Sequence, residues 1–449
     1  MMYLEPLYSG SFSYKHLWAD PVHPLPAYAL LYVLSTTLFN LQIHYIAWFS
    51  IFFQLLLAYF INKSVIGSLK EKISDRFVLI PVIIGINTYI FSLIGNQTYF
   101  WPIMTHCLIG LTLVFLCGYF ADQYFRICRN RKLQYKSYFI PVLIIIFSVL
   151  LFSDWTIIFC TGILLLLIFV LLSNNSLRKP GLKTGVTILT ALVLGYLILE
   201  IFFIEYPRIV NHSLKDVISL LINNFFLNLK AMSAGLFSGV YNFHTFNKVY
   251  GFDPEIYTTI SIVFGLVYLT VFVVYLLKRY YLKSILPPAM MLFSLLYLLS
   301  VIIFRYNPVD NGELCLIVPR YIVFYQFGTI GFFWAVYLLL VNTAGRKILK
   351  CKKICLMILT AILLSNWFIN YLETNKTANY LRTKYPEVSQ NIRNKYTDPS
   401  VRAWWSNQPG RDISWQLDFI HKHKLNVFAP NYPYPEKDTT DNILHKQDN

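Results

Sequence analysis

Four side chains of this sequence combine residue types that can move a proton and hold a phosphate. Asp20 and His23 lie three residues apart, directly ahead of an apolar stretch that begins after Pro26. Arg305 and Arg320 stand at the two ends of a short loop between apolar stretches. A carboxylate can accept a proton from an attacking group, and a guanidinium can bind a phosphate through two parallel hydrogen bonds. Proton transfer beside a bound phosphate is the chemistry that these residues could support.

Each of these residues also has a structural interpretation. Asp20 could cap a helix at the membrane surface, where the helix dipole favours an acid. His23 could be a solvated histidine at the same surface. Arg305 and Arg320 could reach lipid head groups or pair with acids of the loop 306–321. Arginines are unusual next to the membrane on the external side, because basic residues concentrate in cytoplasmic loops. A phosphate ligand would explain their presence there.

The elements that position these residues are predicted to be membrane helices. Of 449 residues, 56% are hydrophobic and only 13% are charged, whereas soluble domains carry roughly 25% charged residues. The apolar stretches are too many and too long for one soluble core, so an ordinary cytosolic enzyme is excluded. We predict an all-α polytopic membrane protein with about ten spans, at residues 41–62, 77–95, 102–120, 139–153, 156–173, 185–204, 257–277, 285–305, 322–342 and 355–372. The short fourth and fifth spans could form a tight hairpin.

The net charge of +16 follows the membrane topology and does not indicate nucleic-acid binding. Of 38 Lys and Arg residues, 20 lie in five loops that alternate along the chain, together with only three acids. These loops are 63–76, 121–138, 174–184, 278–284 and 343–354. Basic loops face the cytoplasm, so the opposite loops and the tail 373–449 are predicted to be external. The domain prediction is an external loop at 1–40, a transmembrane domain at 41–372 and a small external C-terminal region at 373–449.

The first forty residues are predicted to end in a helix that lies on the membrane surface. The apolar stretch after Pro26 has about 14 residues, or ~21 Å of helix, which is short of a ~30 Å hydrocarbon core. Loop parity places residues 1–24 outside, although they contain no signal peptide and no span. Two explanations remain: a first helix precedes Met1, or residues 25–40 cross the membrane. We favour the first.

Three motifs resemble the GT-C glycosyltransferases, polytopic enzymes that use polyprenyl-phosphate sugar donors. Asp20-x-x-His23-Pro-x-Pro, followed by an aromatic-rich helix and a span, is similar to their first external loop in the protein mannosyltransferase and aminoarabinose transferase branches. Pro319-Arg320-Tyr321 opens a span at the external side, as Arg-Tyr often does in related chains. Gly95-Asn96-Gln97 with Trp101 resembles a turn of uncharacterised bacterial proteins of this kind.

The resemblance implies an inverting transfer of a sugar from a polyprenyl phosphate on the external face. It implies Asp20 as the catalytic base and His23, Arg305, Arg320 and Tyr321 as substrate-binding residues; Tyr321 could alternatively belong to the interfacial aromatic belt. No organic cofactor is expected, although a divalent cation could help to hold the phosphate. The expected setting is cell-envelope glycan or glycolipid synthesis in a bacterial inner membrane. The alternatives are an O-antigen-type polymerase and a lipid-linked glycan flippase, which would show mid-membrane polar residues and an inverted repeat.

Other polar residues near the external side are interpreted as structural. Glu200 is expected to form an ion pair, Asp154 to be a turn residue and His106 to be a hydrogen-bonded structural histidine. The cysteine spacing indicates neither an external disulfide nor a zinc site. Residues 214–230 are predicted to form a helix on the outer leaflet.

The tail is predicted to form a small cap. It should hold a helix near 376–395, a helix near 414–423 and a short strand at 425–429, with a disordered end at 435–449.

Overall fold

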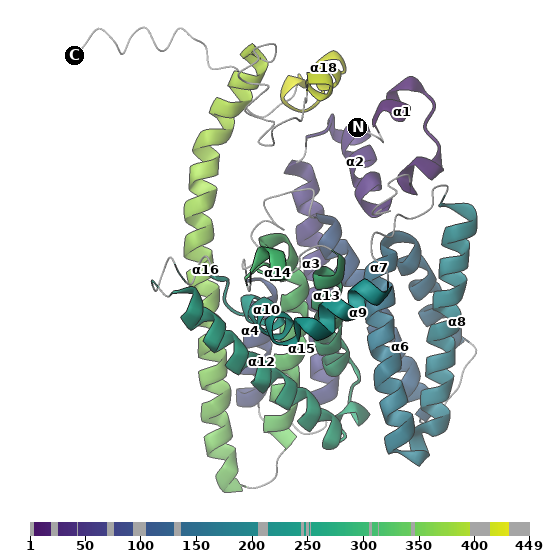
Figure 1. Ribbon diagram of the computed structural model, residues 1–449, viewed down its shortest axis with the longest axis vertical. Helices are drawn as coiled ribbons and strands as arrows, with labels where there is room; N and C mark the ends of the chain where they lie inside the picture. The colour runs from purple at the N-terminus through teal and green to yellow at the C-terminus, as the bar shows by residue number, and fades with distance from the viewer. Residues whose placement is uncertain are drawn as a thin grey trace, which may run out of the picture.

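The structure, a computed structural model, is an all-α bundle in which the described residues form no strand (Figure 1). It describes residues 4–18, 26–42, 44–69, 76–92, 105–129, 136–204, 214–243, 247, 251, 253–304, 308–312, 314–342, 346–395 and 414–430. Most helices run roughly along the long axis of the molecule, and α1 and α2 lie at one end of them. The protein is thus a multi-pass helical membrane protein, as the apolar stretches predict.

Each predicted span coincides with a helix. Among the described residues, eight helices are long and apolar enough to cross a membrane. The long helices are α3 (His44–Leu69), α6 (Thr105–Arg129), α7 (Lys136–Ser173), α8 (Arg178–Phe202), α12 (Pro254–Leu277), α13 (Leu286–Phe304), α15 (Pro319–Asn342) and α16 (Arg346–Lys395). The second predicted span is the shorter helix α4 (Arg76–Ile90). The short helices α1 (Leu4–Ser9) and α2 (Pro26–Phe39) precede α3, and α2 confirms the expected short apolar helix after Pro26.

Helix α7 is the hairpin that the sequence allowed for its fourth and fifth spans. Phe152 has non-helical dihedral angles (φ −146°, ψ 58°). The Ser148 and Thr156 hydroxyl oxygens are 2.6 Å apart, whereas a straight helix would separate these residues by about 12 Å along its axis. The chain therefore turns back at Phe152, and both halves of α7 pack against α6 and α8.

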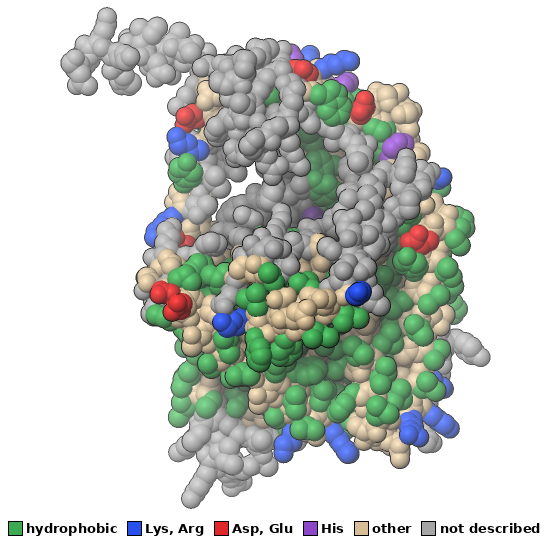
Figure 2. Space-filling model, in the orientation of Figure 1, with side chains coloured by type: hydrophobic (Ala, Val, Ile, Leu, Met, Phe, Trp, Pro, Cys, Tyr) green, Lys and Arg blue, Asp and Glu red, His purple; other side chains and the backbone are tan. Residues whose placement is uncertain are grey.

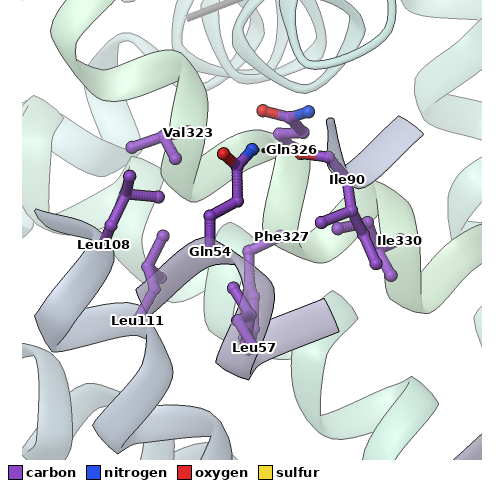
Figure 3. Close-up of a pocket in the computed structure, with 9 residues that line it drawn as sticks. All are labelled: Gln54, Leu57, Ile90, Leu108, Leu111, Val323, Gln326, Phe327 and Ile330. Carbon is purple, nitrogen blue, oxygen red and sulfur yellow. Dashed lines mark hydrogen bonds between the residues drawn. The ribbon is translucent and has the colours of Figure 1, made fainter. Parts of the chain in front are cut away.

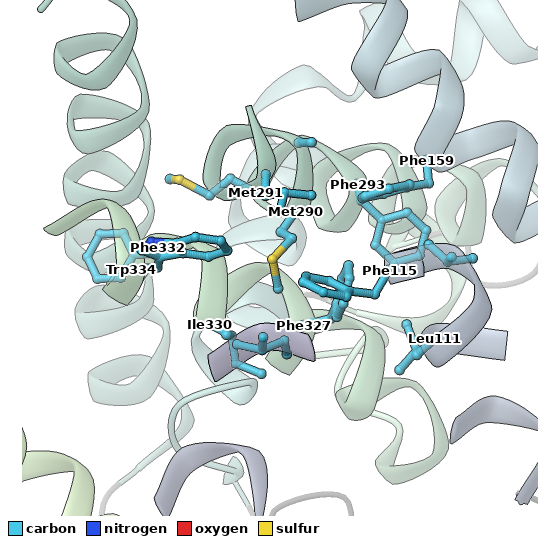
Figure 4. Close-up of a cluster of buried hydrophobic side chains, with 14 of the residues drawn as sticks. Leu111, Phe115, Phe159, Met290, Met291, Phe293, Phe327, Ile330, Phe332 and Trp334 are labelled. Carbon is cyan, nitrogen blue, oxygen red and sulfur yellow. The ribbon is translucent and has the colours of Figure 1, made fainter. Parts of the chain in front are cut away.

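The centre of the bundle is the contact between α13 and α15, where aromatic and methionine side chains interlock (Figure 4). Phe293 and Phe327 have ring centroids 5.5 Å apart, and Phe159 of α7 lies 5.7 Å from Phe293. The close approach depends on Gly331, because a Cβ there would lie 2.7 Å from both the Met290 Cβ and the Pro287 carbonyl oxygen. Helix α15 is consequently the most enclosed of the long helices described.

The predicted surface helix at 214–230 is two helices at an 88° angle. Helix α9 (Leu214–Asn223) keeps an apolar face exposed, as expected for a helix on the membrane surface. Helix α10 (Phe225–Ser238) instead enters the bundle, and its residues 233–238 are buried. It can do so because Gly235 and Gly239 let it approach Leu298 and the α15 backbone closely.

Two expectations for the tail need correction. The last span and the first tail helix are one continuous helix, α16, whose 50 residues extend about 75 Å. The predicted strand at 425–429 is a 3₁₀ turn, Asn426–Phe428, because no second strand is present among the described residues to pair with it. Helix α18 (Ser414–Lys422) confirms the second tail helix and packs Leu417 against Ile392 of α16. The predicted disordered end lies outside the described residues.

The two ends of the bundle differ in charge: the view in Figure 2 shows Lys and Arg at the lower edge, and Lys and Arg together with Asp, Glu and His at the upper end. Lys and Arg side chains line the lower edge of the bundle in Figure 2, while α1, α2 and α18 lie at the upper end in Figure 1. We call these the basic end and the opposite end. The basic end includes Arg126 and Arg129 in the last turn of α6 and Lys278 and Arg279 after α12, two segments that the Arg129–Leu282 hydrogen bond joins.

This division carries a topology prediction. Reporter fusions at residues 70, 130, 180, 281 and 349 should behave as cytoplasmic, and a fusion at residue 410 should behave as external, because basic loops are retained in the cytoplasm. Alkaline phosphatase and fluorescent-protein fusions report the two sides independently. A cytoplasmic signal at residue 410 would contradict the assignment.

Candidate functional site

The structure describes only some of the predicted site residues. Asp20, His23 and Arg305 lie outside the described residues. Arg320 is placed as the second residue of α15, although its side chain is not described. Tyr321 is described fully and is only 5% exposed. The described residues that flank these positions define the candidate site.

The chain on both sides of Asp20 and His23 is fixed to the opposite end of the bundle. Before them, the Trp18 indole N–H donates to the Leu150 carbonyl in the α7 turn at 3.1 Å. The Trp18 ring also packs on Phe203 after α8, with centroids 4.3 Å apart. After them, α2 begins at Pro26 and packs against α3, α6 and α7. The segment that holds the predicted base thus starts and ends above the α6–α7 contact.

A continuous row of aromatic side chains runs from α2 to the start of α15. Tyr28 of α2 meets His106 of α6 edge to face, with centroids 5.4 Å apart. His106 stacks on Trp155 at 5.8 Å and 14°, and Trp155 lies 4.7 Å from Phe324 of α15. Phe324 stacks on Tyr297 of α13 at 4.4 Å, and Tyr297 lies 6.3 Å from Tyr321. We call these residues the aromatic row: Tyr28, His106, Trp155, Phe324, Tyr297 and Tyr321.

The bend of α7 and a glycine of α6 place Trp155 at the middle of the row. Trp155 follows the turn at Phe152 and stacks on the Phe152 ring at 5.2 Å and 13°. A Cβ at Gly110 would lie 2.3 Å from a ring atom of Trp155. Because a rigid indole cannot yield that space, only glycine at position 110 lets Trp155 lie against α6 between His106 and Phe324.

Arg320 stands where the protein can favour an anion. It lies in the first turn of α15, where the helix dipole is positive, and Pro319 begins the helix without an N–H to satisfy. The Tyr321 N–H donates to the Val318 carbonyl at 2.8 Å. The neighbouring ring of Tyr321 is enclosed against Tyr297, so the backbone position of Arg320 adjoins one end of the aromatic row.

Helices α3, α4, α6 and α15 line a small pocket (Figure 3). Its two polar side chains are already used. The Gln54 amide donates to the Ile90 carbonyl at 2.9 Å, and the Gln326 amide donates to the Tyr89 carbonyl at 2.5 Å. These are the last two carbonyls of α4, and the Tyr89 carbonyl also accepts the Ser92 backbone N–H at 3.1 Å. The remaining lining is apolar and the space is only about large enough for a water molecule, so the pocket offers neither a group for catalysis nor room for a lipid chain.

Three other residues at this end, Asp154, Glu200 and Cys315, carry groups that could ionise. Asp154 is exposed in the α7 turn and accepts a hydrogen bond from Ser153 at 3.3 Å, and Glu200 is half-buried in the last turn of α8. Burial raises the pKa of Cys315 to about 11, so its thiol is protonated at neutral pH and is a poor nucleophile. In the part of the chain that the structure describes, no three His, Cys, Asp or Glu residues could hold a metal ion.

The aromatic row could not be predicted from the sequence. Of its six residues, only Tyr321 was predicted to bind substrate, and His106 was predicted to be structural. His106 is buried between Tyr28 and Trp155, and that position was not apparent from one helix alone. Apolar aromatic residues in a membrane protein carry no distinguishing local pattern, and the row draws them from α2, α6, α7, α13 and α15.

Comparison with protein-family models, with curated proteins and with solved structures gave no match to this chain.

Proposed function

We propose that this protein is a membrane glycosyltransferase of the GT-C kind, which transfers a sugar from a polyprenyl phosphate at the end opposite the basic loops. The observation that carries the proposal is the aromatic row. It joins the helix that follows Asp20 and His23 to the first turn of α15, which holds Arg320. The described residues that follow the candidate base and those that adjoin the candidate phosphate ligand thus lie at one end of one bundle.

The proposed reaction assigns one task to each residue. The Asp20 carboxylate accepts the proton of the acceptor hydroxyl or amine while the acceptor atom bonds to the anomeric carbon. The bond between that carbon and the phosphate oxygen breaks, and the polyprenyl phosphate leaves with the electron pair. Arg320 and Arg305 hold the departing phosphate charge, and His23 orients Asp20 or the phosphate. Attack opposite to the leaving group inverts the anomeric configuration.

The aromatic row supplies the apolar part of the site. Aromatic faces are the usual lining of ligand sites in which a few polar groups fix the orientation. Tyr28 and Trp155 would pack against the sugar ring or the first isoprene units. This arrangement suits a donor that is half lipid and half sugar phosphate.

A lipid-linked glycan flippase is the second candidate, and the α9–α10 bend favours it. Broken helices near a substrate are typical of transporters, and α10 enters the bundle after an 88° turn. The two functions differ in their product. An enzyme releases polyprenyl phosphate from its donor, whereas a flippase leaves the donor intact on the other leaflet.

Substitution of Arg320 tests the phosphate ligand. Arg320→Ala should weaken donor use more than Arg320→Lys, because lysine keeps the charge but loses the paired hydrogen bonds of the guanidinium. We expect the alanine variant to lose about 2–5 kcal/mol of transition-state stabilisation, calculated from kcat/KM, because the arginine–phosphate pair is shielded from water in the proposed site. The assay is release of polyprenyl phosphate by the purified protein. Arg382→Ala, which removes an exposed arginine of α16, is the control. Equal activity of wild type, alanine and lysine variants would remove Arg320 from the site.

A further inference from the structure

The basic end contains a turn that α6 holds in one position. Asp122 of α6 accepts the Ile285 backbone N–H at 2.8 Å and the Ser284 hydroxyl at 3.4 Å. Two turns further along α6, the Arg129 guanidinium donates to the Leu282 carbonyl at 2.8 Å. These bonds cross from the end of α6 to the residues between α12 and α13. The turn is therefore part of the rigid bundle.

Five cations lie on the two segments that these bonds join, and one of them, Arg126, forms an ion pair with Asp122. Arg126 and Arg129 come from α6, and Lys278, Arg279 and Lys283 come from the turn; we call these five residues the basic turn site. Lys278, Arg279 and Arg129 are exposed. Arg279 is held at φ 58°, a left-handed conformation that a residue with a Cβ adopts at a cost. The turn thus presents its cations at a fixed place.

The Asp122 carboxylate binds only part of the Arg126 guanidinium. Arg126 Nη2 lies 2.8 Å from the Asp122 carboxylate. Arg126 Nε, however, is buried without a hydrogen-bond partner among the described residues. Arg126 thus keeps a donor group that Asp122 does not bind, next to the exposed cations Arg129, Lys278 and Arg279.

The position of the site identifies the anion. Leu277, directly before Lys278, is 69% exposed, and Val273, one turn earlier on α12, is 48% exposed. The cations therefore lie at the edge of the apolar face of α12, where lipid head groups meet the acyl chains. Basic residues between helices at this depth can bind anionic head groups.

We propose that the basic turn site binds the head-group phosphate of an anionic phospholipid, whose acyl chain lies along Leu277 and Val273 of α12. The turn cations surround the phosphate. Arg126 and Arg129 join the head group to α6, so the lipid links α6 to the α12–α13 turn. This site lies at the end opposite the aromatic row and does not depend on the proposed glycosyl transfer.

Native mass spectrometry of the full chain, carrying added phosphatidylglycerol or phosphatidylcholine, tests this site. Wild type should retain phosphatidylglycerol in preference to phosphatidylcholine. The triple variant Lys278→Gln, Arg279→Gln, Lys283→Gln should bind it about a hundredfold more weakly, since each cation near a charged membrane surface contributes a comparable increment. The control triple variant is Arg178→Gln, Lys179→Gln, Lys183→Gln, which removes the same charge from the first turns of α8. It should retain most of the preference.

Three results would overturn the proposal. Equal losses in both triple variants would mean general attraction to surface charge, and equal retention of the two lipids would mean no head-group site. Displacement of the lipid by inorganic phosphate alone would identify a phosphate-ion site instead. Thermal unfolding without added lipid shows whether each variant is folded. The variant Lys278→Arg, Arg279→Gln, Lys283→Arg, which keeps two of the three charges, should restore binding.

Discussion

Asp20→Asn should nearly abolish formation of the glycan product while protein level and donor binding persist. Asparagine keeps the shape of the side chain and much of its hydrogen bonding but cannot accept the acceptor's proton. A positioned general base contributes about 10²–10⁴-fold to a rate, so a loss of that size is expected. The measurement is product formed in cells that carry the variant, alongside donor release by the purified protein.

The structural interpretation of Asp20 predicts the opposite result. If Asp20 only caps the helix that follows it, asparagine is an equally good cap and the change costs a few tenths of a kcal/mol. Activity would then survive. Glu5→Gln, which neutralises an exposed carboxylate of α1, is the matched control and should be silent. Near-normal product with Asp20→Asn would direct the search for a base to Asp154, Glu200 or Asp310.

The second large effect concerns folding, at the contact of Arg126 with Asp122. The Asp122 side chain is only 2% exposed and its carboxylate lies 2.8 Å from Arg126. Arg126→Leu leaves that carboxylate buried without its charge partner, which typically costs about 3–5 kcal/mol. The free energy of unfolding, measured in detergent by denaturant titration, should fall by that amount.

A second substitution at the same contact separates charge from packing. In the double variant Arg126→Leu, Asp122→Asn the buried charge is gone, and the asparagine oxygen can still accept the Ile285 N–H. Most of the lost stability should return. An equal loss in the single and double variants would assign the effect to the packing of Arg126.

The spans could be predicted from the sequence because a membrane requires long apolar stretches, and each such stretch became a helix. The α7 hairpin was foreseen as an alternative, because Asp154 and Trp155 interrupt two stretches that are each short. The contact of the Ser148 and Thr156 hydroxyls shows that the two stretches form a hairpin. Local features of this kind are readable because their cause lies within a few residues.

Features that depend on distant partners were predicted less well. The polar half of α16 contains Pro386 and differs in composition from its apolar half, so two elements were expected. The sequence of α10 showed its polar residues but not that Gly239 would meet the α15 backbone. The aromatic row joins residues from Tyr28 to Phe324, almost 300 positions apart. Only the folded bundle brings such residues together.

Binding of polyprenyl phosphate to the purified full chain tests the central claim most directly, because every donor of the proposed class contains it whatever its sugar. The measurement is thermal unfolding in mixed micelles saturated with phosphatidylglycerol, with polyprenyl phosphate or the uncharged polyprenol added. At a hundredfold excess over Kd, polyprenyl phosphate should raise the free energy of unfolding by about 2.7 kcal/mol. Polyprenol should add much less, and Arg320→Ala should remove most of the gain. Equal stabilisation by the two lipids, or a gain unchanged in Arg320→Ala, would contradict a lipid-phosphate site at the opposite end.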